Sequence, residues 1–263
     1  MPIEPVRSLS VALVQARLSW RDPAGNRAHL EQQLERQRGP FELALLPETF
    51  TTGFLGDPDL PMEDMHGPTV EWMTTLAARY QCALAGSAVI VDKDHRYNRF
   101  LLATPDGAVR WYDKRHLFAF GGENLRYSGG QERVIWPFRG WRICPQVCYD
   151  LRFPVWCRNR DDYDLLLFVA NWPGKRLAHW SALLRARAIE NQAWVIGVNR
   201  VGQDGNGITY PGHSQVFDPL GEPLADLGEE ETCQTVALDL ERVAATRRQF
   251  PFQADADHFE LLP

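Results

Sequence analysis

The sequence lacks the paired spacings through which cysteines and histidines usually build structural sites. Its cysteines number five, an odd count, and contain no CxxC pair, which argues against both a disulfide framework and a zinc ribbon. Its seven histidines are scattered without an HExxH spacing. We therefore expect reduced thiols, as in a cytoplasmic protein, and no metal site. The cysteines are Cys82, Cys144, Cys148, Cys157 and Cys233.

A strongly basic surface and long hydrophobic runs are also missing. The chain has 28 Lys and Arg against 34 Asp and Glu, a formal net charge of −6, and no basic cluster interleaved with aromatic residues. Nucleic acid is therefore not an expected partner, because phosphate backbones attract basic surfaces. No apolar run approaches the length of a membrane span, and the first residues do not resemble a signal peptide. We expect a soluble, cytoplasmic protein with no membrane association.

Nucleotide-binding fingerprints are absent as well, since the sequence contains neither GxGxxG nor a P-loop motif. The glycine-rich segment Gly202–Gly207 lies between two expected strands. We interpret it as a hairpin loop rather than a ligand-binding loop. The sequence therefore predicts no cofactor.

The chain does contain a mixed order of strands and helices in 263 residues, without a linker-like gap. Apolar and β-branched runs predict strands, and helical periodicity predicts helices. The expected strands cover 9–15, 43–46, 82–91, 99–104, 109–111, a run that ends before residue 148, 163–170, 193–199, 215–218 and 232–239. The expected helices cover about 24–38, 69–80 and 177–191, with short helices after residue 148 and after 239. This order predicts one α/β domain, residues 1–263, with some antiparallel pairing.

The most informative segment is the apolar run 141–147, which ends on Cys148 where the backbone must turn. A strand followed at once by a turn and a short helix lifts the side chain at the junction out of the sheet, and leaves the next backbone N–H groups available to a ligand. This placement suits a nucleophile, with the N–H of Tyr149 as an oxyanion donor. A lone cysteine at a strand end is, however, more often a small apolar core residue.

Two other strand ends carry groups whose chemistry matches a thiol nucleophile. Glu48 and Lys114 each lie just beyond an apolar run. A carboxylate can take the thiol proton and later protonate a departing amine. An ammonium group can favour the thiolate and stabilise an oxyanion. Each residue alone could equally be solvated, and no spacing rule shows that Glu48, Lys114 and Cys148 converge.

With these residues in this order, the sequence resembles the nitrilase or carbon–nitrogen hydrolase superfamily, whose Glu–Lys–Cys triad has similar separations. Within it, Cys-Tyr-Asp-Leu-Arg-Phe-Pro and Ala-Asn-Trp-Pro look most like the omega-amidase branch, which hydrolyses the terminal amide of 2-oxoglutaramate and 2-oxosuccinamate. The matching segments extend through most of the chain: 46–48 with 51–54, 112–118 with 122–123, 142–154, 170–173 and 187–191.

The resemblance implies a four-layer αββα sandwich whose subunits pair into an αββα–αββα homodimer. Residues 250–263 would then pack across the dimer, with a frayed terminus as the alternative. The implied activity is that of a cysteine-dependent amidohydrolase acting through a thioester. Another aliphatic amidase or nitrilase, and a non-catalytic binding protein with the same fold, are the alternatives. A thiol-transfer role for the CxxxC pair Cys144 and Cys148 is a further one.

The resemblance also assigns roles to individual residues. Cys148 would be the nucleophile, Glu48 the general base and acid, and Lys114 an oxyanion ligand together with the N–H of Tyr149. Glu123 would orient Lys114 or the attacking water. A keto-acid substrate also needs a cation for its carboxylate, for which arginine is well suited. The candidate substrate-binding residues are His116, Phe118, Arg126, Arg152, Trp172, Lys175 and Arg176.

Overall fold

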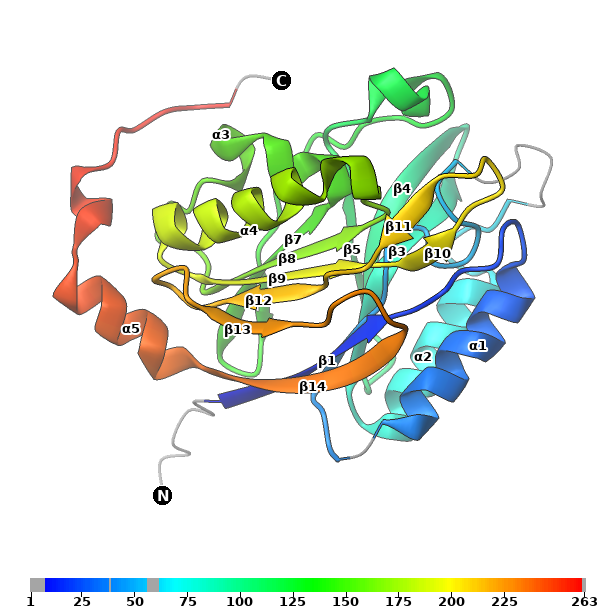
Figure 1. Cartoon of the computed structure of the whole chain (residues 1–263), viewed down its shortest axis with the longest axis horizontal. Coiled ribbons are helices and arrows are strands. Elements are labelled where there is room, and N and C mark those ends of the chain that lie inside the picture. Colours follow the sequence, from blue (N-terminus) through cyan, green and yellow to red (C-terminus); the bar gives the residue numbers. More distant parts are fainter. Residues whose placement is uncertain (1–7, 38, 56–61, 262–263) are drawn as a thin grey trace.

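Two six-stranded sheets form the framework of the computed structural model, which describes residues 8–37, 39–55 and 62–261 (Figure 1). The first sheet consists, in spatial order, of β14 (Thr232–Asp239), β1 (Ser8–Gln15), β2 (Leu43–Leu45), β3 (Ala83–Asp92), β4 (His95–Ala103) and β5 (Val109–Asp113). Its central strands β1, β2 and β3 are parallel, and the remaining pairs are antiparallel.

The second sheet consists of β13 (Pro223–Asp226), β12 (Gln215–Phe217), β9 (Trp194–Asn199), β8 (Leu165–Ala170), β7 (Trp141–Val147) and β6 (Trp136–Phe138). Its three central strands, β7, β8 and β9, run parallel, and the outer pairs are antiparallel. Every residue of β8 is buried, because helices and the other sheet cover its two faces. This burial explains why the strand is an unbroken apolar run in the sequence.

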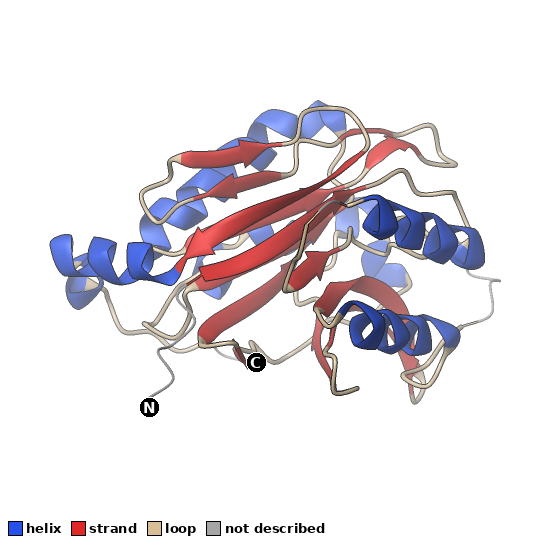
Figure 2. Ribbon diagram, turned by 90° about the horizontal axis from the view of Figure 1, so that it is seen from below, coloured by secondary structure: helices blue, strands red, loops and turns tan. Residues whose placement is uncertain are grey.

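Helices cover the outer face of each sheet, so the molecule has four layers (Figures 1 and 2). Helices α1 (Pro23–Arg36) and α2 (Pro68–Tyr80) lie on the first sheet, and α3 (Pro154–Cys157) and α4 (Leu177–Asn191) lie on the second. The side chain of Asp22 caps α1, which begins with a proline as many helices do. No helix within the described ranges is long and apolar enough to cross a membrane.

The alternation of side chains along β1 shows how the layers share the core. Leu9, Val11 and Leu13 pack into the cluster between the two sheets. Ala12 and Val14 point to the opposite face and pack with the apolar side chains of α1 and α2. Successive strand residues face opposite sides of a sheet, so one buried strand serves two cores. The predicted αββα sandwich is therefore confirmed.

Most predicted helices and strands are present. The differences concern the ends of elements and the short strands at the edges of the second sheet. Helix α4 has the predicted bounds, whereas α1 ends at Arg36, before the predicted end at residue 38, which lies outside the described residues. The sequence prediction missed β6 and β13, both short and both containing a proline, a residue that argues against strand assignments. The segment Gly202–Gly207 forms a hairpin as predicted, because β10 (Val201–Gln203) and β11 (Thr209–Pro211) pair there. The expectation that it would not be a ligand-binding loop was too narrow, since Asn206 at its tip lines the same cavity as Cys148.

The last described segment, residues 250–261, forms an arm beyond α5 (Leu240–Gln249) and includes the short helix η5 (Phe252–Asp255) (Figure 1). Its base is held by a hydrogen bond of 2.7 Å from Gln192 Nε2 to the carbonyl oxygen of Phe250. The ring of Phe252 is 63% exposed. The arm therefore exposes an apolar side chain to solvent. The last two residues of the predicted segment 250–263 lie outside the described residues.

Candidate active site

The three predicted strand-end groups meet at one place between the two sheets. Glu48 follows β2 and Lys114 follows β5 in the first sheet, and Cys148 follows β7 in the second. Lys114 Nζ lies 2.9 Å from Glu48 Oε1, and the thiol of Cys148 lies close enough to the Glu48 carboxylate for each to shift the pKa of the other. The structure thus brings together groups that the sequence separates by many residues.

The carboxylate of Glu48 is completely buried and fully hydrogen-bonded. Its Oε1 accepts from Lys114 Nζ at 2.9 Å and from Asn98 Nδ2 at 2.8 Å. Its Oε2 accepts from the backbone N–H of Asn171 at 2.7 Å and from Asn171 Nδ2 at 3.2 Å. These donors fix the orientation of the carboxylate and favour its ionised form.

The ammonium group of Lys114 is likewise buried and lies between two carboxylates. Its Nζ donates to Glu48 and contacts both oxygens of Glu123, Oε1 at 3.0 Å and Oε2 at 2.9 Å. Glu123 is itself held by the backbone N–H of Phe118 at 2.7 Å and by Asn98 Nδ2 at 3.1 Å. Asn98 therefore bridges the two carboxylates, and Glu123 orients Lys114 in this structure.

Cys148 occupies a strained position at the start of the short helix η3 (Cys148–Arg152). Its φ angle is 46°, in the left-handed region that costs a residue with a side chain about 1–3 kcal/mol. The side chain is 9% exposed. The N–H of Tyr149, in the first turn of η3, has no acceptor within the described part of the chain, as expected for the first donors of a helix.

Asp150 holds this turn in place. Its Oδ2 accepts from the backbone N–H of Val147 at 3.0 Å and from the Tyr112 hydroxyl at 2.9 Å. Its Oδ1 accepts from the backbone N–H of His116 at 2.9 Å and lies 2.8 Å from His116 Nδ1. The carboxylate thus ties the turn after β7 to the segment after β5, and it compensates the strain at Cys148.

The buried charges determine the resting protonation of the cluster. Burial alone would raise the pKa of Glu48, but Lys114 and the hydrogen bonds hold it below its usual value. Burial alone would lower the pKa of Lys114, yet Glu123 and Glu48 raise it well above its usual value. Burial and then Glu48 raise the pKa of Cys148 well above its usual value, although Lys114 opposes them. At neutral pH the cluster holds a thiol, a carboxylate and an ammonium group.

This result changes one expectation. The sequence analysis expected Lys114 to favour a thiolate, but two carboxylates already compensate its charge. The cluster of Lys114, Glu48 and Glu123 carries a net charge of −1, and a free thiolate at Cys148 would make it −2 in a buried site. Ionisation of the thiol therefore requires transfer of its proton to Glu48, which leaves the net charge unchanged.

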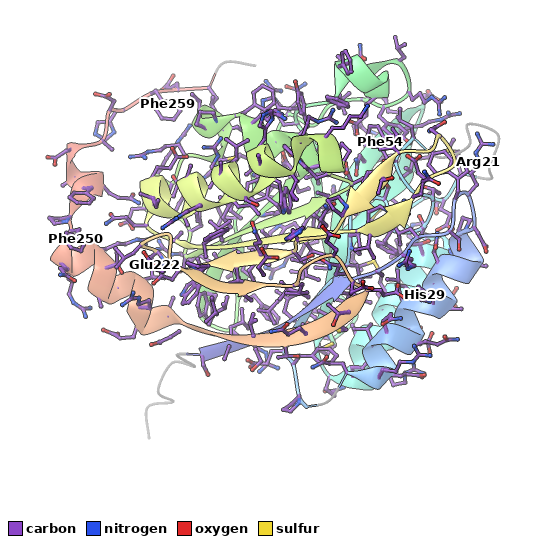
Figure 3. All side chains as sticks on the ribbon, viewed as in Figure 1. Arg21, His29, Phe54, Glu222, Phe250 and Phe259 are labelled. Atoms are coloured by element: carbon purple, nitrogen blue, oxygen red, sulfur yellow. The ribbon has the colours of Figure 1, made fainter. Side chains whose placement is uncertain are left out.

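A cavity of about 240 Å³ opens on Cys148. Figure 3 places Phe54, one of its lining residues, at the opposite end of the molecule from Phe250 of the C-terminal arm. The volume is small compared with drug-binding pockets and suits a short substrate. Its polar and charged lining residues are Cys148, Tyr149, Arg152, Asn171, Arg176, Asn206 and Tyr210.

The predicted substrate-binding residues fall into two groups. Phe118, Arg152, Trp172 and Arg176 line the cavity. His116 instead stacks on Phe153, with ring centroids 3.7 Å apart, and binds Asp150 outside the cavity lining.

Two predicted basic residues also lie outside the lining. Arg126 Nη1 donates to the carbonyl oxygen of Leu55 at 3.0 Å. Lys175 is exposed on the short turn η4 (Gly174–Arg176). The structure therefore reduces four candidate cations to Arg152 and Arg176.

Sequence reasoning missed Asn98, Asn171 and Asp150 as site residues. Asn98 lies within β4 between polar and aromatic residues, so the sequence carries no signal that its side chain is buried, and only the structure shows it. Asn171 follows β8 and Asp150 follows β7, so both occupy the strand-end position that identified the other groups. In the described ranges, no group of three or more His, Cys, Asp or Glu side chains is arranged to hold a metal ion.

Comparisons with known proteins agree with this geometry. The family model described as carbon-nitrogen hydrolase matches residues 10–248. Omega-amidase YafV of Escherichia coli (strain K12) is 47% identical over 257 residues, which cover 96% of this chain and 98% of that protein. The 2-oxoglutaramate amidase of Bacillus subtilis (strain 168) is 32% identical over 247 residues, 92% of this chain and 95% of that protein.

A solved structure is similar along nearly the whole chain. The crystal structure of a CN-hydrolase superfamily protein from Xanthomonas campestris superposes with a TM-score of 0.94 and is 50% identical in sequence. The match covers 97% of this chain and 99% of that one. That structure holds an arsenic adduct in its active site.

Proposed function

The chain belongs to the carbon–nitrogen hydrolase family and is a hydrolase of carbon–nitrogen bonds, and from this premise we propose that it is an omega-amidase. It converts 2-oxoglutaramate or 2-oxosuccinamate to the 2-oxo acid and ammonia. The observation that carries the proposal is the convergence of Cys148 with the ion pair of Glu48 and Lys114 at a small cavity lined by two arginines. The similarity to enzymes named omega-amidase and 2-oxoglutaramate amidase supports it.

In the proposed reaction, the Cys148 sulfur attacks the amide carbon while Glu48 accepts the thiol proton. The proximity of the two side chains allows this direct transfer. Because the thiol is neutral at rest, deprotonation and attack are coupled. The buried cluster avoids a second negative charge before the substrate is present.

The tetrahedral oxyanion is stabilised by the backbone N–H of Tyr149 and by the ammonium group of Lys114. A well-placed donor of this kind contributes about 3 kcal/mol to lowering the barrier. Lys114 already contacts both oxygens of Glu123. It can turn one N–H to the oxyanion and still keep one bond to Glu123.

Glu48 then protonates the departing nitrogen, and ammonia leaves as the carbon–nitrogen bond breaks. A thioester remains on Cys148. Water, deprotonated by Glu48, attacks the thioester, and the sulfur regains its proton as the carboxylic acid is released. One carboxylate thus acts alternately as base and acid, and the enzyme returns to its starting state.

The test is ammonia release by the purified protein from 2-oxoglutaramate, measured beside glutamine, simple aliphatic amides and a nitrile. We expect the highest kcat/KM for 2-oxoglutaramate, because the cavity joins an amide-cleaving thiol to two cations. A higher kcat/KM for a neutral amide or a nitrile would agree with the chemistry of the family but would reject the omega-amidase proposal. A complete lack of turnover would favour a non-catalytic binding protein.

We also propose that the chain forms a homodimer through the surface of α4 and the C-terminal arm. Ile189 on α4 is 49% exposed and lies against Gly221, whose chain neighbour Leu220 is 38% exposed, and Phe252 on the arm adds a further exposed apolar side chain. Contiguous exposed apolar surface often marks an interface. Light scattering should give twice the chain mass, and a monomer at micromolar concentration would contradict the proposal.

The single-domain organisation and the cytoplasmic location stay predictions.

A further inference from the structure

We propose that Asn98 is a positioning residue that allows Lys114 to leave one of its carboxylate partners and turn to the oxyanion. The inference rests on the proposed function and deepens it, because it adds a residue to the machinery that cleaves the amide. Asn98 lies outside the lining of the cavity that opens on Cys148. It therefore acts on the reaction through its neighbours and not through the substrate.

Strand β4 places Asn98 inside the molecule, beside the catalytic cluster. Its side chain is completely buried and faces the same side of the sheet as Phe100 and Leu102, which pack between the two sheets. Its backbone carbonyl oxygen accepts from the backbone N–H of Lys114 at 3.0 Å. One residue thus holds the backbone from which Lys114 projects and also presents an amide group to the cluster.

Two donors and two acceptors form a closed ring around the charges of the cluster. Asn98 Nδ2 donates to Oε1 of Glu48 at 2.8 Å and to Oε1 of Glu123 at 3.1 Å. Lys114 Nζ donates to the same two oxygens, at 2.9 and 3.0 Å. Ionised carboxylates only accept hydrogen bonds, so the nitrogen of the amide, and not its oxygen, must face them.

Lys114 must give up one hydrogen bond when it binds the oxyanion. Its ammonium group has three N–H donors, and the resting structure uses all of them, one to Glu48 and two to Glu123. A buried carboxylate oxygen that loses its donor destabilises the site.

Asn98 supplies the donor that remains. If Lys114 turns away from Oε1 of either glutamate, Asn98 still donates to that oxygen. If Lys114 turns away from Oε2 of Glu123, the backbone N–H of Phe118 remains, at 2.7 Å. Asn98 therefore serves two of the three ways in which one N–H of Lys114 can be released.

The amide group of Asn98 uses its donors and leaves its acceptor idle. Its Oδ1 is buried and has no hydrogen-bond partner among the described residues. Most buried carbonyl oxygens have a partner, so the site requires the two hydrogens of the nitrogen. A neutral donor also leaves the net charge of Lys114, Glu48 and Glu123 at −1. A second cation would instead favour the ionised form of Glu48 and oppose its protonation by the thiol.

The first test compares kcat and KM for ammonia release by Asn98→Ala and by the wild type. We expect kcat to fall about 10- to 100-fold, the range for a lost charge-assisted hydrogen bond. KM should stay close to the wild-type value, because an interaction that is used only in the transition state does not affect ground-state binding. A fall in kcat of less than about tenfold, or a loss that comes from KM alone, would overturn the proposal.

The matched control is Asn159→Ala. Asn159 is also a buried asparagine, and its Nδ2 donates to two carbonyl oxygens, those of Tyr163 at 2.9 Å and Asn191 at 3.1 Å. Neither acceptor belongs to the catalytic cluster, so Asn159→Ala should keep the wild-type kcat at a temperature at which both variants are folded. An equal fall in kcat in the two variants would mean that lost packing slows the reaction, and the proposal would be rejected.

Asn98→Asp separates the donors of the side chain from its shape. Aspartate has nearly the same size, but its carboxyl group offers at most one hydrogen and cannot donate to both glutamates. We expect kcat to fall by about tenfold or more in this variant as well. A smaller loss would show that the shape of the side chain is sufficient, which contradicts the proposal.

The pH profile distinguishes a role in the cluster from a purely structural one. Removing a donor from a carboxylate raises its pKa, and kcat/KM falls when Glu48 becomes protonated. The acidic limb of the profile should therefore move to higher pH in Asn98→Ala and stay in place in Asn159→Ala. An unmoved limb in Asn98→Ala would count against the proposal. The other titratable groups around Glu48 are Lys114, Cys148, Glu123 and Tyr127, and burial raises the pKa of Tyr127 to about 12.

Failure of the proposed function would appear differently. If the wild type prefers another amide or a nitrile, the omega-amidase proposal falls, and the Asn98 variants are compared on that substrate, because Asn98 contacts the catalytic cluster and not the acyl group. A tenfold or larger loss of kcat there would support the role of Asn98 alone. A wild-type kcat in both Asn98 variants would reject the inference and leave the omega-amidase proposal standing. A wild type that turns over no substrate would reject both.

Discussion

Replacing Cys148 by alanine is expected to lower kcat/KM for 2-oxoglutaramate by about 10⁴-fold or more, the scale seen when a covalent nucleophile is removed. Without the sulfur no thioester can form, and Glu48 has no thiol proton to accept. The fold should persist, because the left-handed turn is held by Asp150 rather than by the thiol. Ammonia release under saturating substrate measures the loss, and the thermal midpoint confirms folding.

A matched control for this variant is Cys233→Ala. Cys233 lies on β14 outside the cavity lining, and burial raises the pKa of its thiol to about 12. Its removal should leave turnover unchanged. Mass spectrometry of acid-quenched enzyme should also detect an acyl adduct in the wild type and in Cys233→Ala, but not in Cys148→Ala. Substantial turnover by Cys148→Ala would reject the nucleophile assignment.

The parts of the site that the sequence predicted are those encoded by local pattern. Cys148, Glu48 and Lys114 each follow an apolar strand, and a strand end is recognisable from periodicity alone. Their convergence is a tertiary property. It depends on β2 and β5 lying in one sheet and β7 in the other, which only the family resemblance implied.

The parts of the site that the sequence did not predict depend on the direction in which a side chain points, and not on its position along the chain. His116 lies beside Lys114 in the sequence, but its ring turns to Asp150 and stacks on Phe153 rather than entering the cavity. Lys175 and Arg176 are neighbours in one short turn, yet only Arg176 lines the cavity. Composition cannot distinguish such pairs, because a one-residue shift changes which way a side chain points.

Replacing Glu48 by glutamine is expected to lower kcat by about 10³-fold, within the usual range for a residue that acts as general acid and base. Glutamine keeps the size of the side chain but cannot accept the thiol proton. Steady-state ammonia release measures the loss. The control is Glu35→Gln, which removes a half-exposed carboxylate on α1 and should have no effect on turnover.

The same variant tests the charge argument for the resting site. Lys114 and the hydrogen bonds to Glu48 lower the pKa of its carboxyl group from the usual 4.5. Wild-type kcat/KM should therefore be constant across neutral pH and should fall only at a pH below 4.5, where Glu48 becomes protonated. With glutamine at this position Lys114 keeps Glu123 as its anionic partner, and the thiol loses its proton acceptor. Alkylation of Cys148 by iodoacetamide at pH 7 should therefore slow in Glu48→Gln. Alkylation as fast as in the wild type would mean that Glu48 does not activate the thiol.

Combining the two substitutions decides whether the residues act as one unit. If Glu48 serves only the chemistry of Cys148, then Glu48→Gln should cause no further loss in an enzyme that already lacks the sulfur, because effects within one catalytic unit are not additive. The Cys148→Ala/Glu48→Gln variant should therefore be as slow as Cys148→Ala and no slower. A further large loss in the double variant would show that Glu48 supports a path independent of the thioester, and the proposed mechanism would be rejected.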